Sequence, residues 1–181
     1  MIKTLLNEVK EYKKDSILSP VYVSIEAILE VIIPFLMAIL VDNGIEKGDM
    51  SSIWFYGFLM LVAAFVSLWA GAKSGKHAAI ASSGFAKNLR KAEYRNIQNF
   101  SFSNIDAYST SGLITRMMTD VTNIQNAYQM IIRICVRAPL MLIASLIMAF
   151  IINKEMALIF VAAVLVLGVV SFTKMTTDLL P

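Results

Sequence analysis

Long runs of apolar residues, separated by short or strongly polar segments, are the main pattern along this chain. The apolar runs cover residues 17–41, 53–72, 127–152 and 156–173. Because a helix rises about 1.5 Å per residue, each of the first three runs can cross a hydrocarbon core of ~30 Å. The pattern predicts an all-α fold, a polytopic transmembrane helical bundle with three complete spans and most of a fourth. Only 16% of the residues are charged, whereas a soluble domain carries about 25%, which supports the same prediction.

Two of the spans are expected to continue as helix outside the membrane. The second turns polar and basic at Lys73 but contains no proline as far as about residue 100, and the helical pattern before the third span begins at about residue 113. Small residues recur here at spacings that let helix backbones approach closely; they are Ser74, Gly75, Ala78, Ala79, Ala81, Ser82, Ser83 and Gly84. Residues 73–126 are therefore predicted to form a long helical hairpin, with an ordinary loop as the alternative that periodicity leaves open.

The first 16 residues form a separate amphipathic pattern. Apolar residues recur at helical spacing, at Ile2, Leu5, Leu6, Val9 and Tyr12, and charged residues fill the positions between them. A helix of this kind lies in the plane of the membrane interface. We expect residues 1–16 to be an interfacial helix and residues 17–181 to be the membrane domain; a frayed tail is the alternative for the first segment.

Basic residues are distributed unevenly among the polar segments, and they predict the orientation. The N-terminal segment carries four lysines and the long second loop carries seven Lys and Arg residues, but the first and third loops carry one each, Lys47 and Lys154. Lys and Arg concentrate on the cytoplasmic side, so the N-terminus and the hairpin are predicted to be cytoplasmic. These bases flank spans, so we expect a lipid bilayer and no nucleic-acid partner. Many Ile, Asn and Lys residues indicate a bacterial plasma (inner) membrane.

Four charged residues lie inside predicted spans, where they are costly and usually mark a pathway or an ion pair. Glu26 and Glu30 are four residues apart in the first span, as are Arg133 and Arg137 in the third. Glu26 and Arg137 each lie about 22 Å from the external end of their span, so an interhelical pair is geometrically feasible. Glu26, Glu30 and Arg137 are candidates for a polar pathway that accepts an amphipathic substrate. A structural pair is the alternative, and Arg133 is expected to snorkel to the inner interface.

The sequence contains no recognisable catalytic or metal-binding motif. His77 has no neighbouring ligand residues, and Cys135 lies alone within an apolar run. The phosphate-binding pattern G-x-x-x-x-G-K-(S/T) is absent, so these 181 residues are not expected to bind or hydrolyse ATP by that route. No metal and no cofactor is therefore predicted within this chain.

Three stretches follow one another in a specific order. They are Pro34–Ile45, which reads P-x-x-x-x-x-x-x-D-x-G-I and precedes Gly48-Asp49; Arg90–Ser101; and Thr110–Ile124, which reads T-S-G-L-I-T-R-M-M-T-D-V-T-N-I. In order and spacing they resemble the transmembrane domain of ABC (ATP-binding cassette) exporters, of the type with six long helices per half-transporter. One position departs from that family, because Ser111 stands where it has glycine. The chain ends within the fourth span, so we expect it to be part of a longer domain.

The resemblance implies a function for the hairpin tip. In that family the tip is a coupling helix that docks on a nucleotide-binding domain, which makes residues 106–112 the tip here. The contact candidates are Tyr108, Ser109, Thr110, Ser111 and Gly112. Arg116 and Asp120 follow on one helical face, where they could pair with each other or bond to the neighbouring helix or the cassette.

The resemblance also implies partners. A nucleotide-binding cassette, in the same polypeptide or on a partner chain, would bind ATP and Mg, and a second half-transporter would complete a homodimer or heterodimer. The intact assembly would be an ATP-hydrolysing translocase that exports lipids, drugs or peptides by alternating access. Two other readings remain open: a transporter or channel of another mechanism, which predicts discontinuous helices at midplane, and a membrane scaffold whose hairpin binds a partner.

Overall fold

The computed structural model describes residues 8–99 and 110–179 of the chain. Its helices are η1 (Lys10–Tyr12), α2 (Lys13–Leu40), η2 (Val41–Ile45), α3 (Met50–Gln98), α5 (Thr110–Thr115), η3 (Arg116–Asp120), α6 (Val121–Ile152) and α7 (Lys154–Leu179). η1 is a 3-10 helix, and η2 and η3 are short π-helices. No strand occurs among the described residues, so the predicted all-α fold is confirmed.

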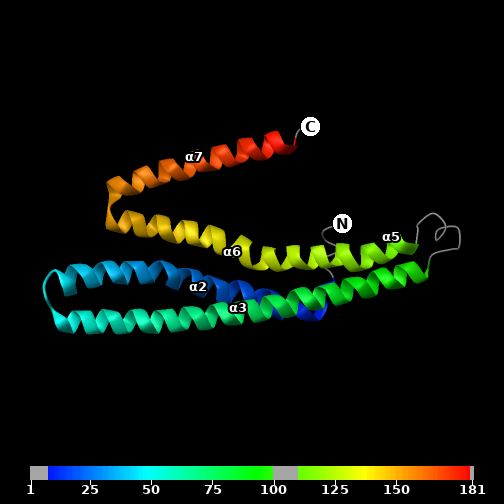
Figure 1. The fold of residues 1–181 in the computed structure, drawn as a ribbon, viewed down its shortest axis with the longest axis horizontal. Helices are drawn as coiled ribbons and strands as arrows, with labels where there is room; N and C mark the ends of the chain where they lie inside the picture. Colours follow the sequence, from blue (N-terminus) through cyan, green and yellow to red (C-terminus); the bar gives the residue numbers. More distant parts are fainter. Residues whose placement is uncertain (1–7, 100–109, 180–181) are drawn as a thin grey trace.

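The helices form a long bundle in which α2 and α3 lie antiparallel and α6 packs against both of them (Figure 1). The first apolar run ends at residue 41, but the helix continues through η2, where Gly44 lies so close to α3 that a Cβ would be 2.6 Å from Ile53 Cγ1. Gly48 then adopts a φ of +65°, a conformation that suits glycine, and Asp49 caps α3. Helix α7 folds back along α6 (Figure 1).

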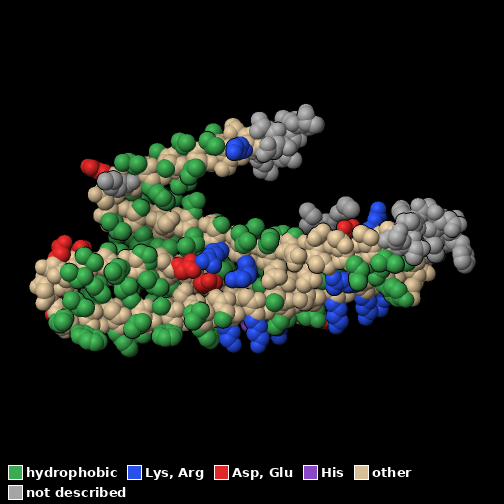
Figure 2. All heavy atoms as spheres, viewed as in Figure 1, with side chains coloured by type: hydrophobic (Ala, Val, Ile, Leu, Met, Phe, Trp, Pro, Cys, Tyr) green, Lys and Arg blue, Asp and Glu red, His purple; other side chains and the backbone are tan. Residues whose placement is uncertain are grey.

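Among the described residues, three helical segments are long and apolar enough to cross a membrane: Lys10–Ile45, Met50–Gln98 and Arg116–Ile152. Within α7 the described apolar stretch is shorter, Ala157–Ser171. At most 17% of the residues in the three apolar windows are buried inside the protein, so most of their side chains face outward, as they do in lipid. Figure 2 shows apolar side chains over the half with the α2–α3 turn and Lys and Arg gathered on the other half. The protein is embedded in a membrane.

Helix α3 is one unbroken rod of 49 residues, about 74 Å long, which confirms the predicted extension of this span beyond the apolar run. From Ala63 to Ala81 its buried residues recur every three or four positions along one side, and from Ser82 to Leu89 burial extends to further faces of the helix. Most of the buried residues are small; they are Ala63, Ser67, Ala70, Ser74, Ala78, Ala81, Ser82, Gly84, Phe85, Ala86 and Leu89. This stripe lets α2 and α6 approach the α3 backbone closely. Five of the eight small residues that the sequence singled out belong to it; Gly75, Ala79 and Ser83 do not.

The N-terminal segment packs on the hairpin. Val9 is 5% exposed and clusters with Phe85, Leu89 and Val121, while the ring of Tyr12 lies against the backbone of Gly84. Helix α2 begins at Lys13, four residues before the expected start of the first span, because no helix-breaking residue separates the two segments. Residues 1–7, which carry most of the predicted interfacial pattern, lie outside the described residues.

Candidate functional site

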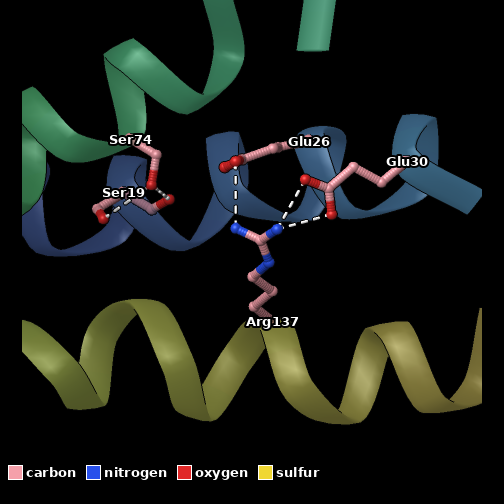
Figure 3. Close-up of polar contacts among 5 residues, drawn as sticks. All are labelled: Ser19, Glu26, Glu30, Ser74 and Arg137. Atoms are coloured by element: carbon pink, nitrogen blue, oxygen red, sulfur yellow. Dashed lines mark hydrogen bonds and ion pairs between the residues drawn. The ribbon is translucent and has the colours of Figure 1, made fainter. Parts of the chain in front are cut away.

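Arg137 on α6 and two glutamates on α2 form an ion-pair cluster (Figure 3), within the apolar runs 17–41 and 127–152. Arg137 Nη1 donates to Glu26 Oε1 at 3.2 Å, and Nη2 lies 2.7 Å from both carboxylate oxygens of Glu30. Residues 26 and 30 are one helical turn apart, so both carboxylates point to the same side of α2. The structure thus brings together all three residues that the sequence proposed for a polar pathway.

Helix α3 approaches the charged side chains closely at two of its glycines. Gly71 lies against the Glu26 side chain, and a Cβ at this position would be 2.9 Å from Glu26 Oε1. One turn further along α3, Gly75 faces Arg133, whose Nη1 would lie 3.8 Å from an added Cβ. Sequence reasoning missed Gly71 because it lies within the apolar run. Its four-residue spacing from Gly75 was the available signal.

The cluster is not electrically balanced. Two carboxylates share the single guanidinium of Arg137, and Glu26 Oε2 is buried with no hydrogen-bond partner among the described residues. The side chain of Glu26 is 13% exposed, against 36% for Arg137, so Glu26 is the more desolvated partner. A buried ionised group costs free energy unless it is paired, so the cluster keeps one incompletely paired carboxylate inside the apolar spans.

Two cavities border the cluster along the groove between α2 and α6. The first has a volume of about 480 Å³ and is lined by Val23, Asn126, Gln129, Met130, Arg133, Ile134 and Arg137. The second has about 410 Å³ and is lined by Glu30, Val31, Pro34, Phe35, Ser145, Met148, Ala149, Ile152 and Phe160. Arg137 belongs to the first cavity and Glu30 to the second, so their ion pair stands between them. A mixed apolar and polar lining of this size suits a small amphipathic molecule.

Further polar contacts join α2 to α3 and α6 on the hairpin side of the ion-pair cluster. Ser74 Oγ donates to Ser19 O at 3.1 Å (Figure 3), and the Ser16 and Tyr128 hydroxyls are 2.8 Å apart. His77, which the sequence left without a role, lies 2.6 Å from Asp15 Oδ1. These contacts hold the three helices together where the apolar run gives way to polar residues.

The α3–α6 hairpin is held together by Arg90. Its Nη2 donates to Thr122 Oγ1 at 3.1 Å, and its Nε donates to Met117 O at 3.4 Å. Met117 lies in the π-helix η3, where the backbone hydrogen-bonding register differs from that of α6. Arg90 thus binds the irregular turn that joins the tip segment to α6.

A comparison with known families identifies the chain. The family model described as the ABC transporter transmembrane region matches residues 17–179. The chain belongs to this family. The resemblance that the three ordered motifs indicated is therefore confirmed.

Similar proteins are much longer than this ABC transporter segment. YfiB of Bacillus subtilis (strain 168), an uncharacterized ABC transporter ATP-binding protein, is 34% identical over 131 residues, which are 72% of this chain and 23% of that protein. Rv1273c of Mycobacterium tuberculosis (strain ATCC 25618 / H37Rv) and Mb1304c of Mycobacterium bovis (strain ATCC BAA-935 / AF2122/97) have the same description. Each is 27% identical over 165 residues, which are 87% of this chain and 27% of that relative. The chain spans about a quarter of the length of the relatives it matches.

The predicted coupling residues of this ABC transporter region fall around the hairpin tip. Tyr108 and Ser109 lie outside the described residues, whereas Thr110, Ser111 and Gly112 open helix α5. Arg116 and Asp120 are the first and last residues of η3. No finding tests a coupling role for these residues, so that role stays a prediction.

The negative charge of Asp120 affects the pKa of Glu93, which lies on the opposite helix of the hairpin. Burial raises the pKa of Glu93 on α3, and the negative charge of Asp120 raises it further, while Arg90 opposes both effects. Glu93 Oε2 is buried and has no hydrogen-bond partner among the described residues. The charge of Asp120 on one side of the hairpin therefore disfavours the ionised form of Glu93 on the other side.

Proposed function

We propose that this chain is part of the transmembrane domain of an ATP-driven exporter and transmits motion between a nucleotide-binding cassette and a substrate pathway. Membership of the ABC transporter transmembrane family supports this function, and the much longer relatives, of which the chain spans about a quarter, are themselves named ATP-binding proteins. The cassette would hold ATP and Mg, either in the same polypeptide or on a partner chain.

One observation carries the coupling role. Helix α3 runs without interruption from the turn at Asp49 to Gln98, and Arg90 ties its far half to η3 and α6. A continuous helix transmits displacement along its axis, whereas a coil would absorb it. A cassette docked at residues 106–112 would therefore move the three spans as levers and open the groove between α2 and α6 to alternate sides.

The substrate pathway is assigned to that groove. Glu26, Glu30 and Arg137 stand between two cavities there, in spans that otherwise carry few charges. We place the hairpin and the N-terminus in the cytoplasm. Efflux of a lipid, drug or peptide from the inner side of a plasma membrane would therefore start at the cavity nearer the hairpin. A second half-transporter, identical or not, would supply the opposite wall.

Crosslinking tests the coupling role directly. A Ser109→Cys variant of the full-length transporter, with Cys135 replaced by Ala, is treated with a short thiol crosslinker in the presence and absence of ATP and Mg. We expect a crosslink to the cassette whose yield changes with nucleotide. Lys47→Cys, at the opposite end of α3, is the matched control and should give none. Equal yields from both positions, or none from Ser109→Cys, would favour a membrane scaffold and contradict the proposal.

A further inference from the structure

The cavity on the hairpin side of the Arg137 cluster contains an arginine with no partner. Arg133 Nε is buried and makes no hydrogen bond, and no ion pair of Arg133 occurs within residues 8–99 and 110–179. Arg137, one turn away, has two carboxylates. The same wall of α6 thus presents one neutralised guanidinium and one that keeps its full charge.

An unpaired guanidinium in this position favours a negatively charged ligand. It offers five N–H donors and no acceptor, and its burial is costly until an anion pairs with it. Asn126 and Gln129 line the same cavity and can donate further hydrogen bonds from their side-chain amides. Carboxylate and phosphate groups are the anions whose geometry matches such donors.

The remaining lining indicates that the ligand also carries an apolar part. Val23, Met130 and Ile134 complete the wall around Arg133, and the second cavity lies beyond the Arg137–Glu30 ion pair. Counted from Ile152 at about 1.5 Å per residue, Arg133 lies ~28 Å down α6, close to the full thickness of a hydrocarbon core. A charged head at Arg133 would therefore sit at the membrane boundary while an alkyl chain extends along the groove.

We infer that the cavity around Arg133 binds an anionic amphiphile, an alkyl chain that ends in a carboxylate or a phosphate, and that this is the substrate class of the transporter. The inference rests on the proposed export function, because it assigns a ligand to the same pathway. Arg137 does not compete with Arg133 for the head group, since Glu26 and Glu30 already neutralise it.

Photolabelling of the full-length transporter in phosphatidylcholine nanodiscs, without nucleotide, tests the inference. The probes are three diazirine-bearing alkyl chains of equal length that end in a carboxylate, a phosphate or a trimethylammonium group. We expect both anionic probes to label residues 126–137 at least tenfold more strongly than the cationic probe. The Arg133→Gln variant should lose about tenfold of that labelling, because it removes hydrogen bonds to a charged group. The Arg133→Lys variant should keep most of it, and Lys87→Gln, which removes an exposed charge outside the cavity, should keep all of it.

The outcomes separate this inference from the proposed function. Equal labelling by anionic and cationic probes, or unchanged labelling of Arg133→Gln, overturns the anion site, and the first comparison needs no variant to fold. Displacement of both anionic probes by millimolar inorganic phosphate overturns the amphiphile class. Nucleotide-dependent crosslinking at Ser109→Cys is measured on the same preparations. If that crosslink is present and the labelling shows no preference for anions, the proposed export function stands and this substrate class is wrong. If the labelling prefers anions and the crosslink is absent, the anion site stands and the proposed coupling to a cassette is wrong.

Discussion

Arg137 Nη2 on α6 lies 2.7 Å from both carboxylate oxygens of Glu30 on α2, although the two residues are 107 positions apart in the sequence. Hydrogen bonds between ionised groups are about twice as strong as those between neutral ones. Together with the bond from Arg137 Nη1 to Glu26, this contact joins two helices whose other side chains at this depth are mainly apolar. It also divides the groove between them into the two cavities.

Replacement of Arg137 by Gln should lower the free energy of unfolding by about 2–4 kcal/mol, between the values for an exposed and a fully buried ion pair. The substitution leaves two carboxylates facing each other without a cation. Glu26→Gln should cost much less, because Glu30 still pairs with Arg137 and the cluster becomes neutral. Thermal unfolding of the full-length protein in detergent measures both effects. A larger loss of unfolding free energy for Glu26→Gln than for Arg137→Gln would contradict the argument that two carboxylates share one cation.

The sequence predicted part of this cluster for a clear physical reason. Helical rise fixes the depth of each residue, so equal distances from the span ends were enough to bring Glu26 and Arg137 to one level. Rise does not fix the rotation of a helix about its axis. The closer contact with Glu30 and the approach of Gly71 depend on that rotation, which is set by packing between helices and could not be obtained from hydropathy.

Gly71→Ala should destabilise the cluster although alanine favours helix. The added Cβ would lie 2.9 Å from Glu26 Oε1, so the carboxylate must move away and lengthen its 3.2 Å bond to Arg137. Gly57 lies in the same helix with open space around it, so Gly57→Ala should instead gain about 0.5–1 kcal/mol. Melting temperatures of the two variants should therefore shift in opposite directions. If both rise, the Glu26 side chain relocates without cost and Gly71 has no special role.

The N-terminal segment shows where amphipathic patterning is ambiguous. Val9 and Tyr12 belong to an apolar stripe that fits a membrane surface and a protein surface equally well. In the structure both lie against α3, because Gly84 leaves a gap in the helix surface and Phe85 and Leu89 provide apolar contacts beside it. Which surface such a stripe meets depends on the tertiary neighbours, and these are not readable from its own sequence.

Gly84→Ala should displace the ring of Tyr12 and cost about 1–3 kcal/mol, the usual range for overpacking a well-filled site. In a Tyr12→Ala background the same substitution should cost almost nothing, because the space is then empty. The double-mutant cycle, measured by thermal unfolding, isolates the contact from other effects of either change. Additive losses would show that Tyr12 does not occupy this position in the membrane-bound protein.

Glu93 should make the stability of the α3–α6 hairpin depend on pH. Burial, reinforced by the charge of Asp120, raises its pKa above the ordinary value near 4.5. The folded hairpin therefore binds this proton more tightly than the unfolded chain does. The stabilisation from Glu93 is complete below pH 4.5 and is lost as the pH rises through the raised folded pKa.

Glu93→Gln removes the ionisable group while it keeps the shape, so it should raise the melting temperature relative to the wild type at pH 7 and have no such advantage below pH 4.5. Asp120→Asn supplies the control. Asp120→Asn removes the charge that helps to raise the pKa of Glu93 but leaves Glu93 buried. The gain in melting temperature from Glu93→Gln should therefore be smaller in the Asp120→Asn background, but it should persist. The difference in melting temperature between each variant pair, followed from pH 4 to pH 8, checks both statements. A gain from Glu93→Gln that is independent of pH would mean that the pKa of Glu93 is the same in the folded and unfolded states, which would contradict the prediction.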